Sequence, residues 1–111
     1  MKTLIKNIEF SNVINLKNLI SYQEAQVVSR TIAQTPAVSI SLFSLDKGEG
    51  ISTHVTPGDA MVQVLEGEAE ITIDINVSNV KAGETIIMPS NVPHGLEARV
   101  RFQMLLTVIK G

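Results

Sequence analysis

Turn-forming residues recur along this chain at short, even intervals, and this spacing limits the fold more than any other feature of the sequence. They cluster at 46–50, 57–59, 66–67, 76–79, 82–84 and 89–93. Between them lie short runs rich in valine, isoleucine and threonine, several of which alternate apolar with polar side chains. Short strands separated by turns about every ten residues are typical of a β-sandwich or a closed barrel. The sequence therefore predicts an all-β fold.

These runs define the expected strands. They are 38–42, 51–55, 61–65, 69–75, 85–88 and 102–109. In 69–75 the apolar side chains alternate with Glu70, Thr72 and Asp74, which predicts a strand with one face in water. The run 102–109 is apolar at almost every position, so we expect a strand that is buried on both faces.

Two N-terminal stretches are less regular. Asn15 is suited to cap one short helical turn, and no longer helix is expected there. In the stretch 21–34, Ser21 and Glu24 form a capping-box pattern that favours a helix. The alternation of β-branched residues from Val27 onward favours a strand instead. The sequence leaves both interpretations open.

The length of 111 residues predicts one domain with one hydrophobic core. We place a barrel at 37–111 and an N-terminal extension at 1–36. The ambiguous stretch of this extension is suited to become a strand added to the sheet of a second copy, as in an exchanged dimer. The expected assembly is a homodimer.

The composition excludes several classes of function. Nine basic and eleven acidic side chains form no basic stripe, so nucleic acid is not an expected partner. The absence of cysteine excludes disulfides, thiolate metal sites and cysteine nucleophiles. No apolar run approaches the roughly 20 residues that span a bilayer, and the N-terminus lacks a signal-peptide pattern. We therefore expect no membrane partner and a cytoplasmic location.

The chain has two histidines, His54 and His94, and each lies where an expected strand meets a turn. Alternate side chains of a strand share a face, so Thr56 is expected to point the same way as His54. By the same rule Leu96 and Ala98 share a face with His94. We expect both imidazoles to face one pocket.

The spacing around the histidines resembles the two sequence motifs of the cupin family. Gly48, His54 and Gly67 stand at the positions of the first motif, and Gly83, Pro89 and His94 stand at those of the second. The sequence departs from the motifs at Thr56, Ala60, Asn91 and Ala98. Asn91 is a mild departure from glycine, because asparagine tolerates a left-handed backbone. The resemblance implies a small antiparallel double-stranded β-helix, or jelly-roll barrel, of the single-domain RmlC-like type.

The resemblance also implies a depleted metal site. Of the family's usual four ligands, His54 and His94 remain, while Thr56 stands in place of a histidine and Ala60 in place of a glutamate. Two imidazoles fall short of the three or four ligands of zinc and of the two histidines and one carboxylate of non-haem iron. Asp59, in the turn beside the lost glutamate, is the best candidate for a third donor. The cofactor of such a site would be one divalent transition metal, namely iron, manganese, zinc or nickel.

Three functions follow as hypotheses. The leading one is a module that binds an unidentified small molecule in the barrel lumen, with or without a metal ion. The pocket residues expected for it are Thr56, Ala60, Val62, Val64, Leu96 and Ala98. The second is a metal-dependent enzyme similar to the oxygenase or isomerase cupins, and the third is a non-catalytic structural or regulatory subunit. No residue identifies a substrate or a catalytic group, so whether the chain is an enzyme stays open.

Overall fold

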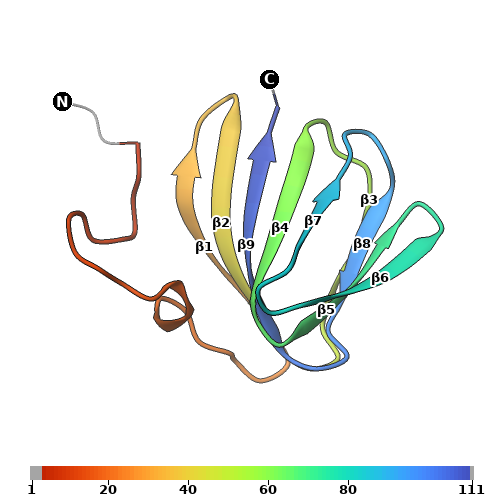
Figure 1. Ribbon diagram of the computed structural model, residues 1–111, viewed down its shortest axis with the longest axis horizontal. Helices are drawn as coiled ribbons and strands as arrows, with labels where there is room; N and C mark the ends of the chain where they lie inside the picture. The colour runs from red at the N-terminus through yellow and green to blue at the C-terminus, as the bar shows by residue number, and fades with distance from the viewer. Residues whose placement is uncertain (1–3, 111) are drawn as a thin grey trace.

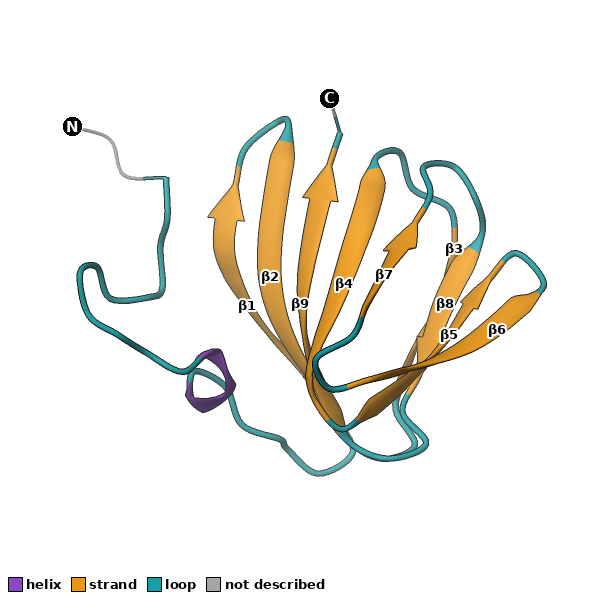
Figure 2. Ribbon diagram, in the orientation of Figure 1, coloured by secondary structure: helices purple, strands orange, loops and turns teal. Residues whose placement is uncertain are grey.

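The computed structural model describes residues 4–110 of the chain. Within them the secondary structure is almost entirely β, which confirms the predicted fold class (Figure 2). The elements are η1 (Leu16–Asn18), β1 (Val27–Gln34), β2 (Val38–Leu45), β3 (Gly50–His54), β4 (Asp59–Glu66), β5 (Glu68–Ile73), β6 (Asn76–Lys81), β7 (Thr85–Met88), β8 (His94–Glu97) and β9 (Phe102–Ile109). No helix in this described part is long and apolar enough to cross a membrane.

The strands form two antiparallel sheets that face each other. One has the order β1-β2-β9-β4-β7 and the other has the order β3-β8-β5-β6. Figure 1 shows that the sheets converge at one end, near the start of β9, and spread apart at the other end, where β9 finishes. We call the end at which the sheets converge the closed end of the barrel and the other the open end.

The central strand β9 explains the continuous apolar run near the C-terminus. It pairs with β2 on one side and β4 on the other, so both of its edges are hydrogen-bonded. Phe102 and Met104 point inward and have no exposed surface. On the opposite face Gln103 is buried and Leu105 and Thr107 are half-buried, so both faces of the strand are covered. The prediction of a strand buried on both sides is thus correct for most of its length.

The ambiguous stretch 21–34 contains a strand and no helix. Val27–Gln34 forms β1, an edge strand that pairs with β2 of the same chain. The backbone at Ala25 has a φ of 56°, which ends any helical path from Ser21. The predicted helical turn is present just before it, where the Asn15 side chain accepts a hydrogen bond from the Lys17 amide.

One predicted turn was misplaced. The residues expected to turn at 76–79 belong to β6, and the chain reverses instead at Asp74 and Ile75. This two-residue turn places Val80 opposite Ala69, and both side chains are buried. Aspartate tolerates the φ of 57° found at Asp74. Burial across the hairpin therefore outweighs the turn propensity of the asparagines and serine that follow.

Glycines and one asparagine hold the left-handed positions that the tight turns need. Gly48, Gly67 and Gly83 all have positive φ angles, as expected from the sequence. At Gly67 an added Cβ would also meet the carbonyl oxygen of Arg101, so no other residue fits between β4 and β5. Asn91 has a φ of 62°, the conformation for which asparagine is a tolerable substitute for glycine.

Candidate functional site

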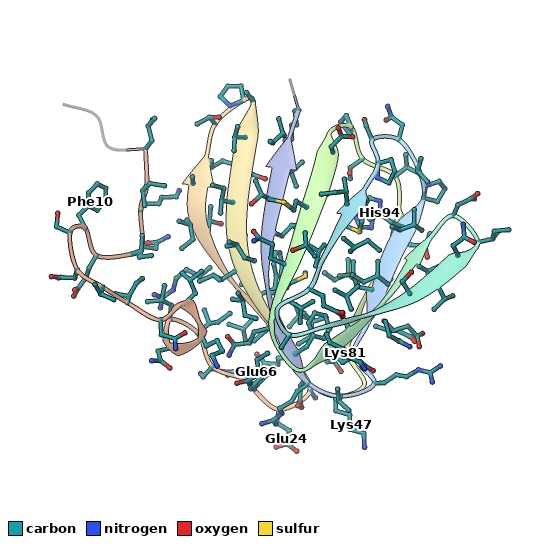
Figure 3. The ribbon with its side chains drawn as sticks, in the orientation of Figure 1. Phe10, Glu24, Lys47, Glu66, Lys81 and His94 are labelled. Atoms are coloured by element: carbon teal, nitrogen blue, oxygen red, sulfur yellow. The ribbon has the colours of Figure 1, made fainter. Side chains whose placement is uncertain are left out.

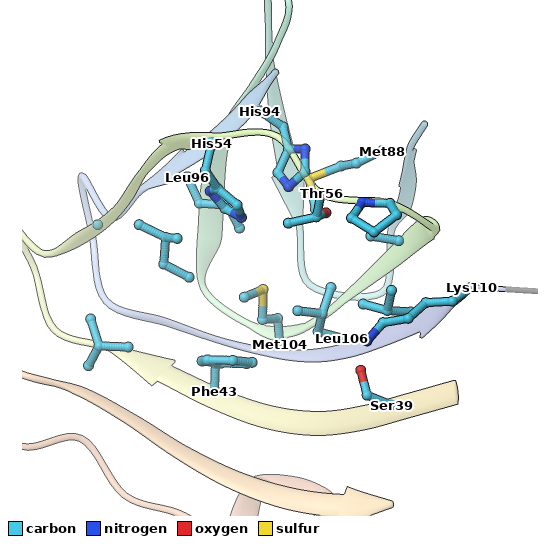
Figure 4. Close-up of a pocket in the computed structure, with 16 residues that line it drawn as sticks. Ser39, Phe43, His54, Thr56, Met88, His94, Leu96, Met104, Leu106 and Lys110 are labelled. Atoms are coloured by element: carbon cyan, nitrogen blue, oxygen red, sulfur yellow. The ribbon is translucent and has the colours of Figure 1, made fainter. Parts of the chain in front are cut away.

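The two histidines lie side by side at the open end of the barrel. His54 ends β3, His94 begins β8, and the two residues are direct partners across these strands. Their ring centroids are 4.5 Å apart, and the ring planes meet at 65° in an edge-to-face arrangement. His94 is buried, whereas His54 is exposed at the rim (Figure 4). The structure therefore brings together two side chains that are 40 positions apart in the sequence.

A β-bulge makes this pairing possible. From the pair Ile51 and Leu96 to the pair of histidines, β3 advances by three residues while β8 advances by only two. In a regular strand Ile51 and His54 would face opposite sides. The extra residue in β3 restores the inward direction, so both line the same cavity.

Gly95 provides the space for the bulge. A Cβ added at Gly95 would lie 3.0 Å from the Thr53 hydroxyl oxygen and 3.2 Å from the Thr53 amide nitrogen. The bulged backbone of β3 therefore lies directly against β8 at a residue without a side chain.

Hydrogen bonds to the backbone fix the orientation of both rings. The Nδ1 of His54 is 2.7 Å from the Ser52 carbonyl oxygen, and the Nδ1 of His94 is 3.0 Å from the Val92 carbonyl oxygen. A carbonyl only accepts, so each Nδ1 is the protonated nitrogen that donates. In the neutral form each Nε2 then carries a lone pair, which can accept a hydrogen bond or bind a metal ion.

These rings form one wall of a cavity of about 600 Å³. Figure 4 shows Met104, Leu106 and Phe43 on the opposite wall, with Thr56 and Met88 close to the rings. The complete lining is Val27, Ser39, Phe43, Gly50, Ile51, His54, Thr56, Pro57, Ala60, Met88, His94, Leu96, Met104, Leu106, Val108 and Lys110. Most of the lining is therefore apolar, and its polar side chains are those of the two histidines, Ser39, Thr56 and Lys110.

Half of the predicted pocket residues line this cavity. Thr56, Ala60 and Leu96 do so. Val62, Val64 and Ala98 do not, and are instead buried within the hydrophobic core. Buried side chains such as Phe102 and Ile71 fill that part of the lumen, as is usual in small barrels.

Asp59 does not join the histidines as a third donor. Its Oδ1 accepts a hydrogen bond from the Ser90 amide at 3.0 Å, and Asp59 is not among the cavity-lining residues. Within residues 4–110 no cluster of three histidine, aspartate or glutamate side chains has a geometry that could hold a metal ion. The described residues therefore do not fit the family's usual four-ligand metal site, and Asp59 does not supply a third donor to the depleted one.

Sequence reasoning missed the wall opposite the rings. Phe43, Met104, Leu106 and Val108 all face the cavity, as does Lys110 at its edge. The signal was present in the run 102–109, because its polar residues, Gln103 and Thr107, share one face and the other face is wholly apolar. The pairing agrees with this, since Phe43 is directly opposite Met104.

Comparisons with known proteins agree with this architecture. Residues 41–110 match the cupin domain family. This chain belongs to the cupin family. A search of the curated proteins finds no match.

Solved structures are similar over most or nearly all of the chain. A conserved protein of unknown function from Streptococcus pyogenes is 46% identical, covers 99% of this chain and 96% of its own, and has a TM-score of 0.97. A cupin superfamily protein from Desulfitobacterium hafniense is 32% identical and has a TM-score of 0.93. The match covers 98% of this chain and 100% of that protein. A cupin 2 conserved barrel domain protein from Leptotrichia buccalis is 39% identical and has a TM-score of 0.86. The match covers 87% of this chain and 47% of that protein. The family and the single-domain barrel are thus established, and the role of this cupin has to be argued from its cavity.

Proposed function

We propose that this cupin binds a small, mostly apolar molecule in the open end of its barrel, with a hydrogen-bond donor of the ligand facing the imidazole pair. The observation that supports this is the cavity of about 600 Å³, which has aliphatic walls and two oriented histidines. Volumes of roughly 300–1,000 Å³ with few, well-placed polar groups are typical of small-molecule sites.

The hydrogen bonds of the rings determine the polarity of the ligand group. Because both Nδ1 atoms donate to backbone carbonyls, each neutral ring offers an acceptor at Nε2. A hydroxyl or N–H group matches such an acceptor, and a ligand without a donor leaves buried His94 unsatisfied. The apolar part of the ligand then contacts Met104 and Leu106 on the opposite wall.

The fluorescence of 2-naphthol provides a direct test, because the chain has no tryptophan that would interfere. We expect saturable binding, and about tenfold weaker binding of 2-methoxynaphthalene, which lacks the donor. The Leu106→Phe variant narrows the cavity without adding a tryptophan and should weaken binding strongly, while Leu105→Phe is its control on the other face of the same strand. Unchanged binding in Leu106→Phe, or no saturable binding of 2-naphthol, contradicts the proposal.

The second candidate is a metal-dependent enzyme similar to the oxygenase or isomerase cupins. It is favoured by the two Nε2 lone pairs, which are the donors that iron, manganese, zinc or nickel would use. It is weakened by the position of Asp59, which is turned to the Ser90 amide, and by Ala60, which offers no donor. Any metal would therefore need ligands from water or substrate.

Elemental analysis of untagged protein, grown with added metals, separates the two candidates. About one tightly held transition metal per chain, lost in the His94→Gln variant, would support the enzyme. Occupancy of a few per cent would remove it and leave the metal-free binding module.

A further inference from the structure

We propose that the natural ligand carries a carboxylate or similar anionic group, which is bound by Lys110 at the side of the cavity away from the imidazole pair. This inference rests on the binding function proposed above, and it adds the charge and polarity of the ligand. The ligand class is an amphiphilic acid with an apolar middle, a donor at one end and an anion at the other.

The charges around the cavity favour an anion. Lys110 is the charged side chain of the lining, no aspartate or glutamate is among the lining residues, and the two histidines can only add positive charge. The ion pairs of the described residues are Arg99 with Glu70 and Arg101 with Asp46, so Lys110 takes no part in them. A cation that pairs with no carboxylate of residues 4–110, and that lies beside an apolar cavity, attracts an anionic ligand group.

The carboxylate that lies near Lys110 along the sheet is directed elsewhere. Asp59 is opposite Ile109 in the pairing of β4 with β9. Its carboxylate accepts from the Ser90 amide, on the side of β4 away from the cavity lining. Asp59 therefore does not neutralise the cavity face of Lys110.

The backbone holds Lys110 in position. Its amide donates to the Ala37 carbonyl oxygen at 2.7 Å, which fixes the residue at the end of β9. Its side-chain Cγ is 3.0 Å from the place a Cβ of Gly58 would occupy, so the aliphatic stem lies over this glycine. Figure 4 shows the side chain running along the cavity edge toward Ser39, away from the rings of His54 and His94. The anion site is thus separated from the donor site by the apolar wall.

Three related probes test the inference: 6-hydroxy-2-naphthoic acid, its carboxamide and 2-naphthol. At pH 7.5 and low salt we expect the acid to bind about fivefold more tightly than the amide, the gain typical of a partly exposed ion pair. The preference should disappear in Lys110→Met and reverse in Lys110→Glu. It should also shrink as the salt concentration rises, because exposed charge interactions are screened. Lys47→Met, which removes a lysine at the closed end, is the matched control and should keep the preference.

Each outcome has a distinct meaning. If the acid and the amide bind equally to the wild-type protein and to Lys110→Met, the anionic ligand is excluded while binding in the cavity stands. If the preference for the acid persists in Lys110→Met, the assignment of Lys110 is wrong. If none of the three probes binds, the binding function itself fails.

Discussion

At the level of single residues, this cupin departs from the motifs of its family at two positions where the resemblance implies metal ligands. Thr56 and Ala60 occupy the two motif positions at which donors are lost, and both line the same cavity as the histidines. Ala60 is buried in β4, where its pairing partners are Met88 and Val108. A donor at either position would therefore face His54 and His94.

We predict that the double variant Thr56→His with Ala60→Glu gains a metal site. A buried glutamate without a partner is unfavourable, so the metal-free variant should melt at a lower temperature than the wild-type protein. Zinc or manganese should restore the melting temperature and bind at about one ion per chain, because binding to the folded state stabilises it. Thermal melts and elemental analysis measure both effects. Thr56→His with Met61→Glu, on the other face of β4, is the control; equal metal binding by both variants would contradict the prediction.

A second prediction concerns Gly95. Replacement by valine places side-chain atoms against the Thr53 backbone, so β3 must move away from β8. We expect the loss of about 1–3 kcal/mol in the free energy of unfolding that overpacking usually causes. Because His54 ends β3, binding of 2-naphthol should weaken as well. Urea unfolding and fluorescence titration test this, with Thr72→Val, on the strand opposite Gly95, as the control. Unchanged stability and binding in Gly95→Val would show that the bulge does not need the glycine.

At the level of elements, the N-terminal segment is attached to the closed end of the barrel by polar contacts. The Tyr22 hydroxyl donates to the Glu66 carboxylate at 2.6 Å, and the Arg101 guanidinium lies 4.6 Å from the centre of the Tyr22 ring. Asp46 accepts hydrogen bonds from the Ala25 amide and from Arg101. Burial, together with the hydrogen bond to Glu66, raises the pKa of Tyr22. Figure 3 shows Glu24 and Glu66 at this closed end, far from the cavity around His94.

Asp46 is predicted to make stability depend on pH in the acid range. Its hydrogen bond with the Ala25 amide, and to a smaller degree Arg101, lowers the pKa of this carboxyl in the folded state. A lowered pKa stabilises the fold above the unfolded value of about 3.9, and this contribution is lost as the pH falls through the folded value. Asp46→Asn should therefore be less stable than the wild-type protein at pH 7, and the difference should shrink near pH 3. The urea midpoints of the variant and the wild-type protein at pH 7, 5 and 3 measure this stability difference, and Asp74→Asn is the control. A stability difference that stays the same at all three pH values would refute the role of the Asp46 charge.

The elements also show how far the sequence predicts this structure. Alternation and turn residues predicted most strands correctly, because strand period and turn chemistry are local properties. The β5–β6 turn was misplaced because the burial of Val80 against Ala69 is a contact between strands. The bulge before His54 depends on β8 and could not be read from β3 alone. The extent of the cavity depends on how Phe102 and Ile71 fill the lumen, which no local pattern encodes.

At the level of the whole molecule, the N-terminal arm, the segment 4–15, carries several exposed apolar side chains. Leu4, Phe10 and Val13 are 62%, 57% and 104% exposed. Figure 3 shows Phe10 on a part of the arm that extends away from the barrel. The arm touches its own sheet at the bridge between Ile5 and Ala33, beside the edge strand β1. An isolated chain therefore leaves apolar surface in water that a partner would cover.

We predict that this surface is buried in a homodimer in which each arm packs on the other copy. In a two-fold dimer every contact occurs twice, and each large apolar side chain that becomes buried contributes about 1.5–3 kcal/mol. Light scattering at micromolar concentration should give twice the 12.0 kDa mass of one chain. Phe10→Ser with Val13→Ser should shift the mass toward the monomer. Ile75→Ser, which removes an exposed side chain from the distant β5–β6 turn, should leave the dimer intact. A wild-type mass of one chain would exclude the dimer, and a dimer that persists without Phe10 and Val13 would place its interface elsewhere on the sheet.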